Sequence, residues 1–336
     1  MQFQKEQKIK NYLADCLVIF FCLSLFAACT GKKAEQASGI NIAVIKGPSS
    51  ISMLKLINEE IGEEADSGLF FEIFASADEI VPKIVQGKID IAAVPPNLSS
   101  VLYNNTQGKV QVIAVGTLGM MYILENGQTI TTLNDLRGKT IYAGFRGKSP
   151  EYDLNYILSE NGIDPDRDLN IEWKSEHTEC VAALSANNNA IAVLPQPFAA
   201  AAQLLNKNIR IAVDLNSEWE KLQENTANPC ALITGVLIAR SEFIEKNPEA
   251  VKKFLDRYSQ SVNFANSNIE ETAALADKYN IVPADVAQKA IPYCNITFIE
   301  GQEMMEKLSG YLRVLYEQNP QSVGGRLPNE EFYFKR

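Results

Sequence analysis

The sequence predicts an α/β fold of two domains, each a mostly parallel sheet flanked by helices. Three observations predict it. Short β-type runs alternate with helical stretches along the chain, and this pattern restarts at Met120. About 300 residues also remain after an N-terminal leader, which is enough for two domains with separate cores.

The first thirty residues differ in kind from the rest of the chain. Lys5, Lys8 and Lys10 precede an apolar run at 16–28 that only Ser24 interrupts, and this is the pattern of a signal peptide. A membrane-spanning helix needs about 20 apolar residues, so a retained transmembrane anchor is the weaker alternative. We therefore expect residues 1–28 to direct export and to take no part in the fold.

The leader ends at residues 25–29 with LFAAC. This ending resembles the lipobox of bacterial lipoproteins, with Phe26 where leucine is usual. The resemblance implies cleavage before Cys29 and a diacylglycerol on its thiol, and ordinary secretory cleavage nearby is the alternative. Small, polar and lysine-bearing residues follow, as a flexible tether requires. We expect residues 29–39 to be a lipidated tether at the outer face of a membrane.

Composition excludes several classes of function. The formal charge of −10 and a pI near 4.9 argue against nucleic acid, which needs a basic face. Once the leader is removed and Cys29 carries lipid, only Cys180, Cys230 and Cys294 remain, and an odd set of scattered cysteines is no disulfide framework. The only histidine, His177, cannot build a histidine-rich metal site. We expect neither a metal nor a cofactor.

The elements of the first domain follow from local pattern. Strands are expected at 40–45, 70–75, 89–94 and 110–115, with helices that end near 61 and span 77–86. After the second domain, one more strand is expected at 233–239. It is followed by helices at 247–266, 269–279, 283–290 and 301–317 and by a surface strap at 320–328.

The second domain repeats the alternation. Ser149 is expected to be the N-cap of a helix at 150–161, because serine accepts a bond from a free N–H and Pro150 suits the first helical position. Strands are expected at 120–124, 140–145, 169–173 and 190–194, with a helical turn at 133–136 and helices at 178–186 and 198–205.

Four segments in chain order resemble the type II periplasmic binding proteins of ABC importers, in the nitrate/sulfonate/taurine and NMT1/THI5-like branch. The third segment is the most specific, because it matches the family's entry into its second domain. The segments are 40–47 (INIAVIKG), 77–92 (ADEIVPKIVQGKIDIA), 133–141 (LNDLRGKTI) and 243–249 (FIEKNPE).

The resemblance implies a two-domain clamshell. Residues 40–117 and 231–336 then form a discontinuous first domain, and 118–212 an inserted second domain. The chain crosses between them near Thr117 and again within 213–230, which acts as return linker and hinge. Closure about such a hinge would capture a solute.

The resemblance also implies a function. We expect an exported, monomeric, lipid-anchored protein that captures a small solute and delivers it to the permease and ATPase of an ABC importer. A sensory or adhesive lipoprotein, which uses the same clamshell to engage a protein partner, is the alternative. An enzyme is not expected, because the sequence has no nucleophile or cofactor motif and only His177 as a histidine.

The expected ligand-binding residues lie where strands lead into helices, since ligands of parallel sheets bind there. For each residue an ordinary role is the alternative: helix capping for the serines, solvation for the cations, strand termination near the prolines, and half-burial for the tyrosines. The first domain is expected to contribute Gly47, Ser49, Ser50, Asn97 and Thr117. The second is expected to contribute Tyr122, Arg146, Lys148, Ser149, Tyr152, His177 and Gln196.

Two classes of solute fit these residues. Arg146 and Lys148 beside a helix N-terminus suit an anion such as a sulfonate or carboxylate. Tyr122 and Tyr152 could instead stack on a small heteroaromatic ring. His177 could hydrogen-bond a solute in either protonation state, although a lone histidine more often has a capping or surface role. The sequence leaves this choice open.

Overall fold

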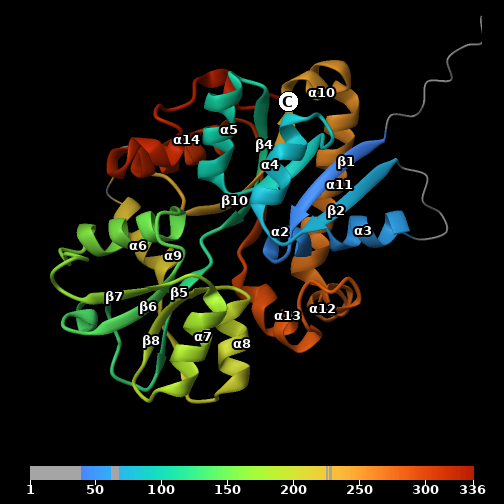
Figure 1. Ribbon diagram of the computed structural model, residues 1–336. Helices are drawn as coiled ribbons and strands as arrows, with labels where there is room; N and C mark the ends of the chain where they lie inside the picture. Colours follow the sequence, from blue (N-terminus) through green and yellow to red (C-terminus); the bar gives the residue numbers. More distant parts are fainter. Residues whose placement is uncertain (1–38, 62–67, 225, 227–228) are drawn as a thin grey trace, which may run out of the picture. The chain divides into compact units, whose positions relative to one another are not determined.

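Two β-sheets, each covered by helices, form the framework of the protein (Figure 1). The computed structural model describes residues 39–61, 68–224, 226 and 229–336. Residues 40–336 group as one compact unit. The predicted leader, Cys29 and nearly all of the tether lie outside the described residues. In the part of the chain that is described, no helix is both long and apolar enough to cross a membrane.

The first sheet has six strands, and its buried strands are apolar on both faces, as expected where helices cover both sides. β1 pairs in parallel with β2 and β3, whereas β10 runs antiparallel between β3 and β4. The order is β11 (Ile296–Ile299), β4 (Val110–Leu118), β10 (Ile233–Arg240), β3 (Ile91–Val94), β1 (Ile40–Ile45) and β2 (Leu69–Phe74).

Helices from both ends of the chain pack around the first sheet, and we call this sheet with its helices the first half. The early ones are α2 (Pro48–Ile51), α3 (Leu54–Ile61), α4 (Ala77–Val85) and α5 (Pro96–Thr106). The late ones are α10 (Ser241–Lys246), α11 (Pro248–Ser267), α12 (Ile269–Lys278), α13 (Ala284–Ala290) and α14 (Gly301–Gln318), with short 3₁₀ turns at Ile291–Tyr293, Pro320–Val323 and Glu330–Phe332.

The second sheet has five strands and, with its helices, forms the second half. β6 pairs in parallel with β7 and β8, and β5 runs antiparallel between β8 and β9. The order is β7 (Asn170–Lys174), β6 (Thr140–Gly144), β8 (Ile191–Pro195), β5 (Met121–Asn126) and β9 (Ile209–Asp214). The helices are α6 (Ser149–Glu160), α7 (His177–Ala186), α8 (Phe198–Leu205) and α9 (Leu215–Gln223), and a 3₁₀ turn spans Leu133–Leu136.

The predicted fold class, an α/β protein with two sheets flanked by helices, is confirmed. Within each sheet, however, the strands that follow a crossing between the halves run antiparallel to their neighbours, so the sheets are mixed rather than mostly parallel. The region predicted as linker contains α9, and β9, β11 and α5 were not predicted. Their short, partly polar sequences carry little periodic signal, and partners distant in the chain stabilise them.

One predicted helix boundary is wrong. The N-cap of α6 is Lys148, and Ser149 is already inside the helix with no capping hydrogen bond of its own. Instead, the Ser149 side chain faces the hydroxyl of Tyr311 in α14. A tertiary contact has therefore taken the hydroxyl that the local pattern assigned to the helix end.

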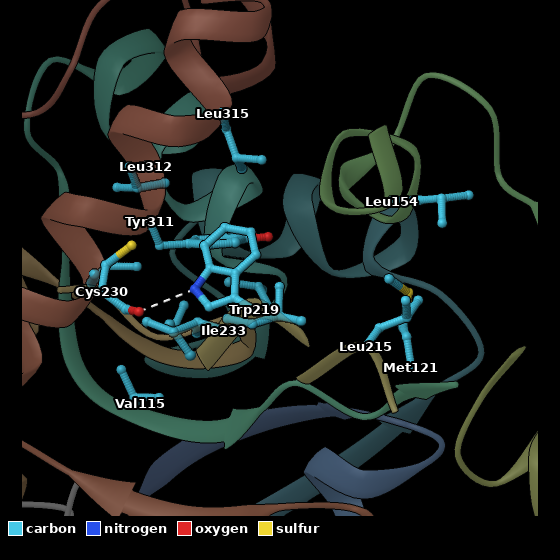
Figure 2. Close-up of a cluster of buried hydrophobic side chains, with 14 of the residues drawn as sticks. Val115, Met121, Leu154, Leu215, Trp219, Cys230, Ile233, Tyr311, Leu312 and Leu315 are labelled. Atoms are coloured by element: carbon cyan, nitrogen blue, oxygen red, sulfur yellow. Dashed lines mark hydrogen bonds between the residues drawn. The ribbon is translucent and has the colours of Figure 1, made fainter. Parts of the chain in front are cut away.

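A continuous hydrophobic core connects the two halves (Figure 2). Trp219 of α9 is fully buried at its centre, and its indole N–H donates to the carbonyl of Cys230 at 3.0 Å. Tyr156 of α6 and Tyr311 of α14 lie against the same indole, with ring centroids 4.7 and 5.8 Å away. We call Tyr156, Trp219 and Tyr311 the aromatic joint, because its members come from both halves.

The three cysteines in the described part of the chain are free thiols, and all are buried. Burial raises the pKa of Cys180 and of Cys230 to about 11, and that of Cys294 to about 12. Their thiolate forms, which are the reactive species, are therefore scarce in the folded protein.

Candidate functional site

The predicted binding loops lie on two sheet edges that meet at one crossing of the chain. In the first sheet the carboxyl ends of β1, β3 and β4 share an edge, because β10 runs antiparallel to both β3 and β4. In the second sheet the carboxyl ends of β6, β7 and β8 share an edge with the start of β5. Only Gly119 and Met120 separate β4 from β5, so these two edges face the same junction.

The first half contributes polar groups that are mostly satisfied within the loop itself. Ser49 donates to the carbonyl of Ile45 at 2.9 Å, and Ser50 donates to the carbonyl of Gly47 at the same distance. Gly47 has a φ of 126°, and a Cβ added there would meet no atom within 4 Å. The backbone of Gly47 is also engaged, because its N–H donates to Ser50 Oγ at 3.2 Å and its carbonyl accepts from the Ser50 and Ile51 amides. The loop therefore offers open space at Gly47 rather than free hydroxyls.

Asn97 and Thr117 also have protein partners. The Asn97 amide is directed to the carbonyl of Ser322, at 3.5 Å, in the C-terminal segment. The Thr117 hydroxyl is buried and accepts from the hydroxyl of Thr234 at 3.1 Å, across the β4–β10 pair. Both side chains are therefore bonded to other parts of the first half and are not free to bind a solute.

Tyr122 links the halves directly. Its ring is buried, and its hydroxyl donates to the carbonyl of Tyr293 at 2.8 Å. The Tyr293 ring meets the Tyr122 ring edge to face, at 6.3 Å, and is itself 48% exposed. Burial raises the pKa of Tyr122 far above its ordinary value, so this hydroxyl stays protonated as a donor. Tyr293, and not Tyr122, is the ring accessible from outside.

The loop at 146–149 and the first turn of α6 contain two exposed cations and two hydroxyl groups that face the first half. The Arg146 side chain is 74% exposed and lies 3.8 Å from the Glu151 carboxylate, and Lys148 is also exposed. By contrast, Ser149 faces Tyr311, and the Tyr152 hydroxyl accepts from the Asn319 amide at 2.9 Å. The two cations are thus solvated, whereas the two hydroxyls are engaged with the first half.

His177 lies in an aromatic setting at the start of α7. Its ring packs against Phe145, which follows β6, and Phe198, which begins α8, with centroid separations of 4.8 and 5.1 Å. His177 is 9% exposed, and its Nδ1 is buried without a hydrogen-bond partner. Phe145 has a φ of 62°, a conformation that is uncommon for an aromatic residue and that concentrates at functional sites.

Burial also fixes the charge of His177. It lowers the pKa of the imidazole to about 4, so the ring is neutral near pH 7. A Cβ at Gly144 would stand 2.9 Å from Nδ1, which shows how closely β6 approaches this side of the ring. The neutral imidazole thus packs against two phenyl rings, and its Nδ1 faces the backbone of β6.

Gln196 ends β8 and is also buried. Its Oε1 accepts from the amide of Ala200 at 3.2 Å, in the first turn of α8. The side chain therefore fixes the entry into α8, next to Phe198, and has no free amide oxygen aimed away from the protein chain.

Sequence reasoning missed Phe145, Phe198 and Tyr293. Phe145 directly follows a strand, and Phe198 follows Gln196-Pro197. Both positions lie after strand ends, where binding residues are expected, but we selected their polar neighbours instead. Tyr293 comes from the late chain, so no local pattern could place it beside Tyr122. Among the described residues, no group of three or more histidine, cysteine or acidic side chains is arranged to hold a metal ion.

The chain matches a protein family over most of its length. The profile of the family described as NMT1/THI5 like matches residues 65–272. A protein of Brucella abortus named as a binding protein is 22% identical over 231 residues, which cover 69% of this chain and 66% of that relative. The aligned region thus spans just under two thirds of the length of this curated relative.

Solved structures share the fold. An ABC transporter protein from Parabacteroides distasonis is 22% identical, with a TM-score of 0.74, over 89% of this chain and 99% of that one. The periplasmic aliphatic sulphonate binding protein SsuA from Escherichia coli is 19% identical, with a TM-score of 0.69, over 89% and 93%. The fold also occurs in the desulfurization enzyme DSZB, at 12% identity and a TM-score of 0.58 over 88% and 96%, so fold alone does not decide between binding and catalysis.

Proposed function

Because the chain belongs to the NMT1/THI5-like family, we propose that it is the extracytoplasmic solute-binding component of an ABC importer. It captures a small molecule where the two sheet edges meet and presents it to the permease and ATPase of the importer. The sensory or adhesive alternative is not favoured, since the structural neighbours named above are transport and binding proteins in most cases. We also propose that it acts by binding alone, without catalysis.

One observation carries the proposal. His177 is a neutral, nearly buried imidazole with an unpartnered Nδ1, and it lies between Phe145 and Phe198 at the shared edge of β6, β7 and β8. A buried polar group without a partner costs free energy in a folded protein. A group of this kind at the carboxyl ends of parallel strands is where a ligand is expected.

Between the two solute classes, the described side chains favour a small heteroaromatic ring. The rings of Phe145, His177 and Phe198 supply flat apolar surface, and the imidazole edge supplies one hydrogen bond. Arg146 and Lys148 are exposed, and exposed cations attract an anion only weakly because solvent screens them. An anion remains the competing class, and these two cations would hold it.

The surrounding architecture is part of the same proposal. The domains are 40–117 with 231–336, and 118–212, and the solute is enclosed by rotation about the crossings near Thr117 and within 213–230. Cys29 carries a lipid that keeps the exported protein, a monomer, at the outer face of the bacterial membrane, or at the periplasmic side where an outer membrane exists.

The test is a melting-temperature screen of the purified protein against heteroaromatic bases, alkanesulfonates and carboxylates, because a solute that binds only the folded protein raises its stability. A heteroaromatic compound should raise the melting temperature. His177→Phe, which keeps the aromatic packing and removes the hydrogen bond, should weaken its affinity about tenfold. Arg146→Ala is the matched control and should leave affinity for that compound unchanged.

The pH dependence adds a second readout. The pKa of His177 is about 4 when folded, so solute affinity should be constant from pH 5 to 8. The ordinary imidazole pKa is near 6.5, and the unfolded chain therefore takes up a proton first. Stability linked to His177 is full above pH 6.5 and is lost as the pH falls towards 4. Binding of sulfonates alone, abolished by Arg146→Ala and untouched by His177→Phe, would contradict the heteroaromatic assignment.

A further inference from the structure

A buried carboxyl group lies at the contact between the halves and has no role in the proposed solute site. Asp153, in the second turn of α6, is 2% exposed. Its Oδ1 accepts from the hydroxyl of Tyr311, in α14, at 2.9 Å, and Tyr311 is fully buried. The pair therefore joins an acid of the second half to a phenol of the first half inside the protein.

The surroundings favour the protonated acid. A buried carboxylate is stable only beside a cation or several donors. Burial raises the pKa of Asp153 well above its ordinary value. The hydrogen bond from Tyr311 lowers the pKa and opposes that rise in part. Tyr311 in turn faces Ser149 and the Cys230 thiol. No cation is among these groups.

Helix α9, which packs against α6, supplies no buried charge to Asp153 either. The buried residues of α9, which lies beside α6, are Leu215, Trp219 and Gln223, and the indole N–H of Trp219 is committed to Cys230. Gln223 is bonded to Tyr156 and Cys230. Ionisation of Asp153 in place would thus leave a negative charge with one neutral donor.

Two further contacts fasten the same turn of α6 to the first half. The Ser149 side chain faces Tyr311, and the Tyr152 hydroxyl accepts a hydrogen bond from Asn319, the residue that follows α14. α14 itself packs on β4 and α5 of the first sheet. Since the Phe145–Lys148 loop runs directly into this turn, its position relative to the first half depends on these contacts.

We propose that Ser149, Tyr152 and Asp153, with Tyr311 and Asn319, form a proton-dependent latch that docks the start of α6 on the first half. The latch holds while Asp153 carries its proton, and ionisation releases it because the charge must reach water. It sets the position of the loop that contains Phe145. Its meaning for solute capture rests on the proposed function, whereas the latch itself does not.

The pH window follows from proton linkage. An exposed aspartate ionises near pH 4, whereas Asp153 in the docked state holds its proton to higher pH. The docked state therefore binds more protons than the released or unfolded state above pH 4. The stability of the docked state relative to those states is greatest below pH 4. Above pH 4 the equilibrium constant that favours the docked state falls about tenfold per pH unit until the docked acid ionises.

The first experiment is urea unfolding of the full protein at pH 5, 6, 7 and 8, compared with Asp153→Asn. Both proteins carry Trp173→Phe, so that emission reports Trp219 in the joint. Asparagine keeps the size of the side chain and an acceptor for Tyr311 but cannot ionise. The unfolding constant of the aspartate protein should rise about tenfold per pH unit relative to the asparagine protein. His177 contributes equally to both and cancels.

The second experiment separates a latch from an isolated buried acid. In Tyr311→Phe the hydroxyl is lost while the ring remains, and amide hydrogen exchange of residues 149–156 should accelerate about tenfold relative to that of β1. Glu160→Gln, an exposed change at the end of α6, should alter neither experiment. Parallel pH profiles for Asp153 and Asp153→Asn, or unchanged exchange in Tyr311→Phe, would overturn the latch. Neither measurement needs a solute, so a failed solute screen would count against the proposed function alone.

Discussion

Among the described residues, two contacts between the halves are built from opposite kinds of residue. One contact is the aromatic joint, where α6 and α9 of the second half meet α14. The other lies between α8 of the second half and α13 of the first. In Figure 1 they flank the β4–β5 crossing on different sides. This difference indicates how the halves can move.

The aromatic joint combines large rings with close backbone approach. Trp219 and Tyr311 are both fully buried. Gly310 lets α14 come so near the second crossing that an added Cβ would lie 2.5 Å from the Cβ of Cys230. Full burial of a phenylalanine-sized side chain stabilises a folded protein by about 1.5–3 kcal/mol. Separation of this contact is costly.

The second contact is made largely of methyl groups. Ala200 of α8 is fully buried in the same hydrophobic cluster as Ala287 and Ala290 of α13. We call these three residues the alanine face. Alanine side chains bury little area, and Tyr122 adds one hydrogen bond to Tyr293 beside them. We therefore expect the alanine face to separate first, with the aromatic joint as the pivot.

Trp219→Ala should cause the largest loss of stability among the substitutions at the two contacts. The change removes the centre of the joint and a buried hydrogen bond, so it should lower the free energy of unfolding by about 3–5 kcal/mol. Urea denaturation followed by circular dichroism measures it. Leu205→Ala, at a position that is 72% exposed on α8, should stay within about 0.5 kcal/mol. A similar small loss for Trp219→Ala would mean that the joint does not hold the halves together.

Gly310→Ala should have the second-largest effect, and it should lower the free energy of unfolding where this substitution in a helix usually raises it. Within a helix this change normally stabilises by about 1 kcal/mol. Here the new methyl group would collide with Cys230, so a loss of about 1–3 kcal/mol is expected. The double variant with Cys230→Gly should recover most of that loss, because the clash is removed. Thermal denaturation of both variants checks the prediction, and an additive double variant would contradict it.

Tyr122→Phe should have the smallest effect on overall stability. It removes the hydroxyl that donates to the Tyr293 carbonyl, a bond worth about 1 kcal/mol. The same change should loosen the alanine face, so hydrogen exchange in α13 should accelerate while exchange in α14 stays as in the parent protein. If α14 loosened to the same degree, the two contacts would not be independent.

Local pattern was sufficient for much of the fold. Apolar strands such as β1 and β3 are buried on both faces, so their composition alone identifies them. It failed at β9 and α9, where short sequences gain their stability from distant partners. Trp219 illustrates this, because its neighbours Tyr156 and Tyr311 belong to helices far before and after it in the chain.

The candidate site follows from strand ends, whereas the partners of its side chains do not. Strand ends directed attention to Gly47, His177 and the 146–149 loop, which remain predictions. The partners of each polar group depend on tertiary contacts, which the sequence does not contain. Ser149 was expected to cap a helix and contact a solute, yet its hydroxyl meets Tyr311. The aromatic neighbours of His177 come from two other strand ends, β6 and β8.

The accessibility of the three buried thiols reports local opening of the protein. Cys180 lies in the core of the second half, Cys230 at the aromatic joint, and Cys294 in the cluster that contains the alanine face. Each thiol is concealed until its own region opens, since alkylating reagents attack only an accessible thiolate. The order in which the three are alkylated therefore ranks the openings of three regions, in the unaltered protein and without an attached label.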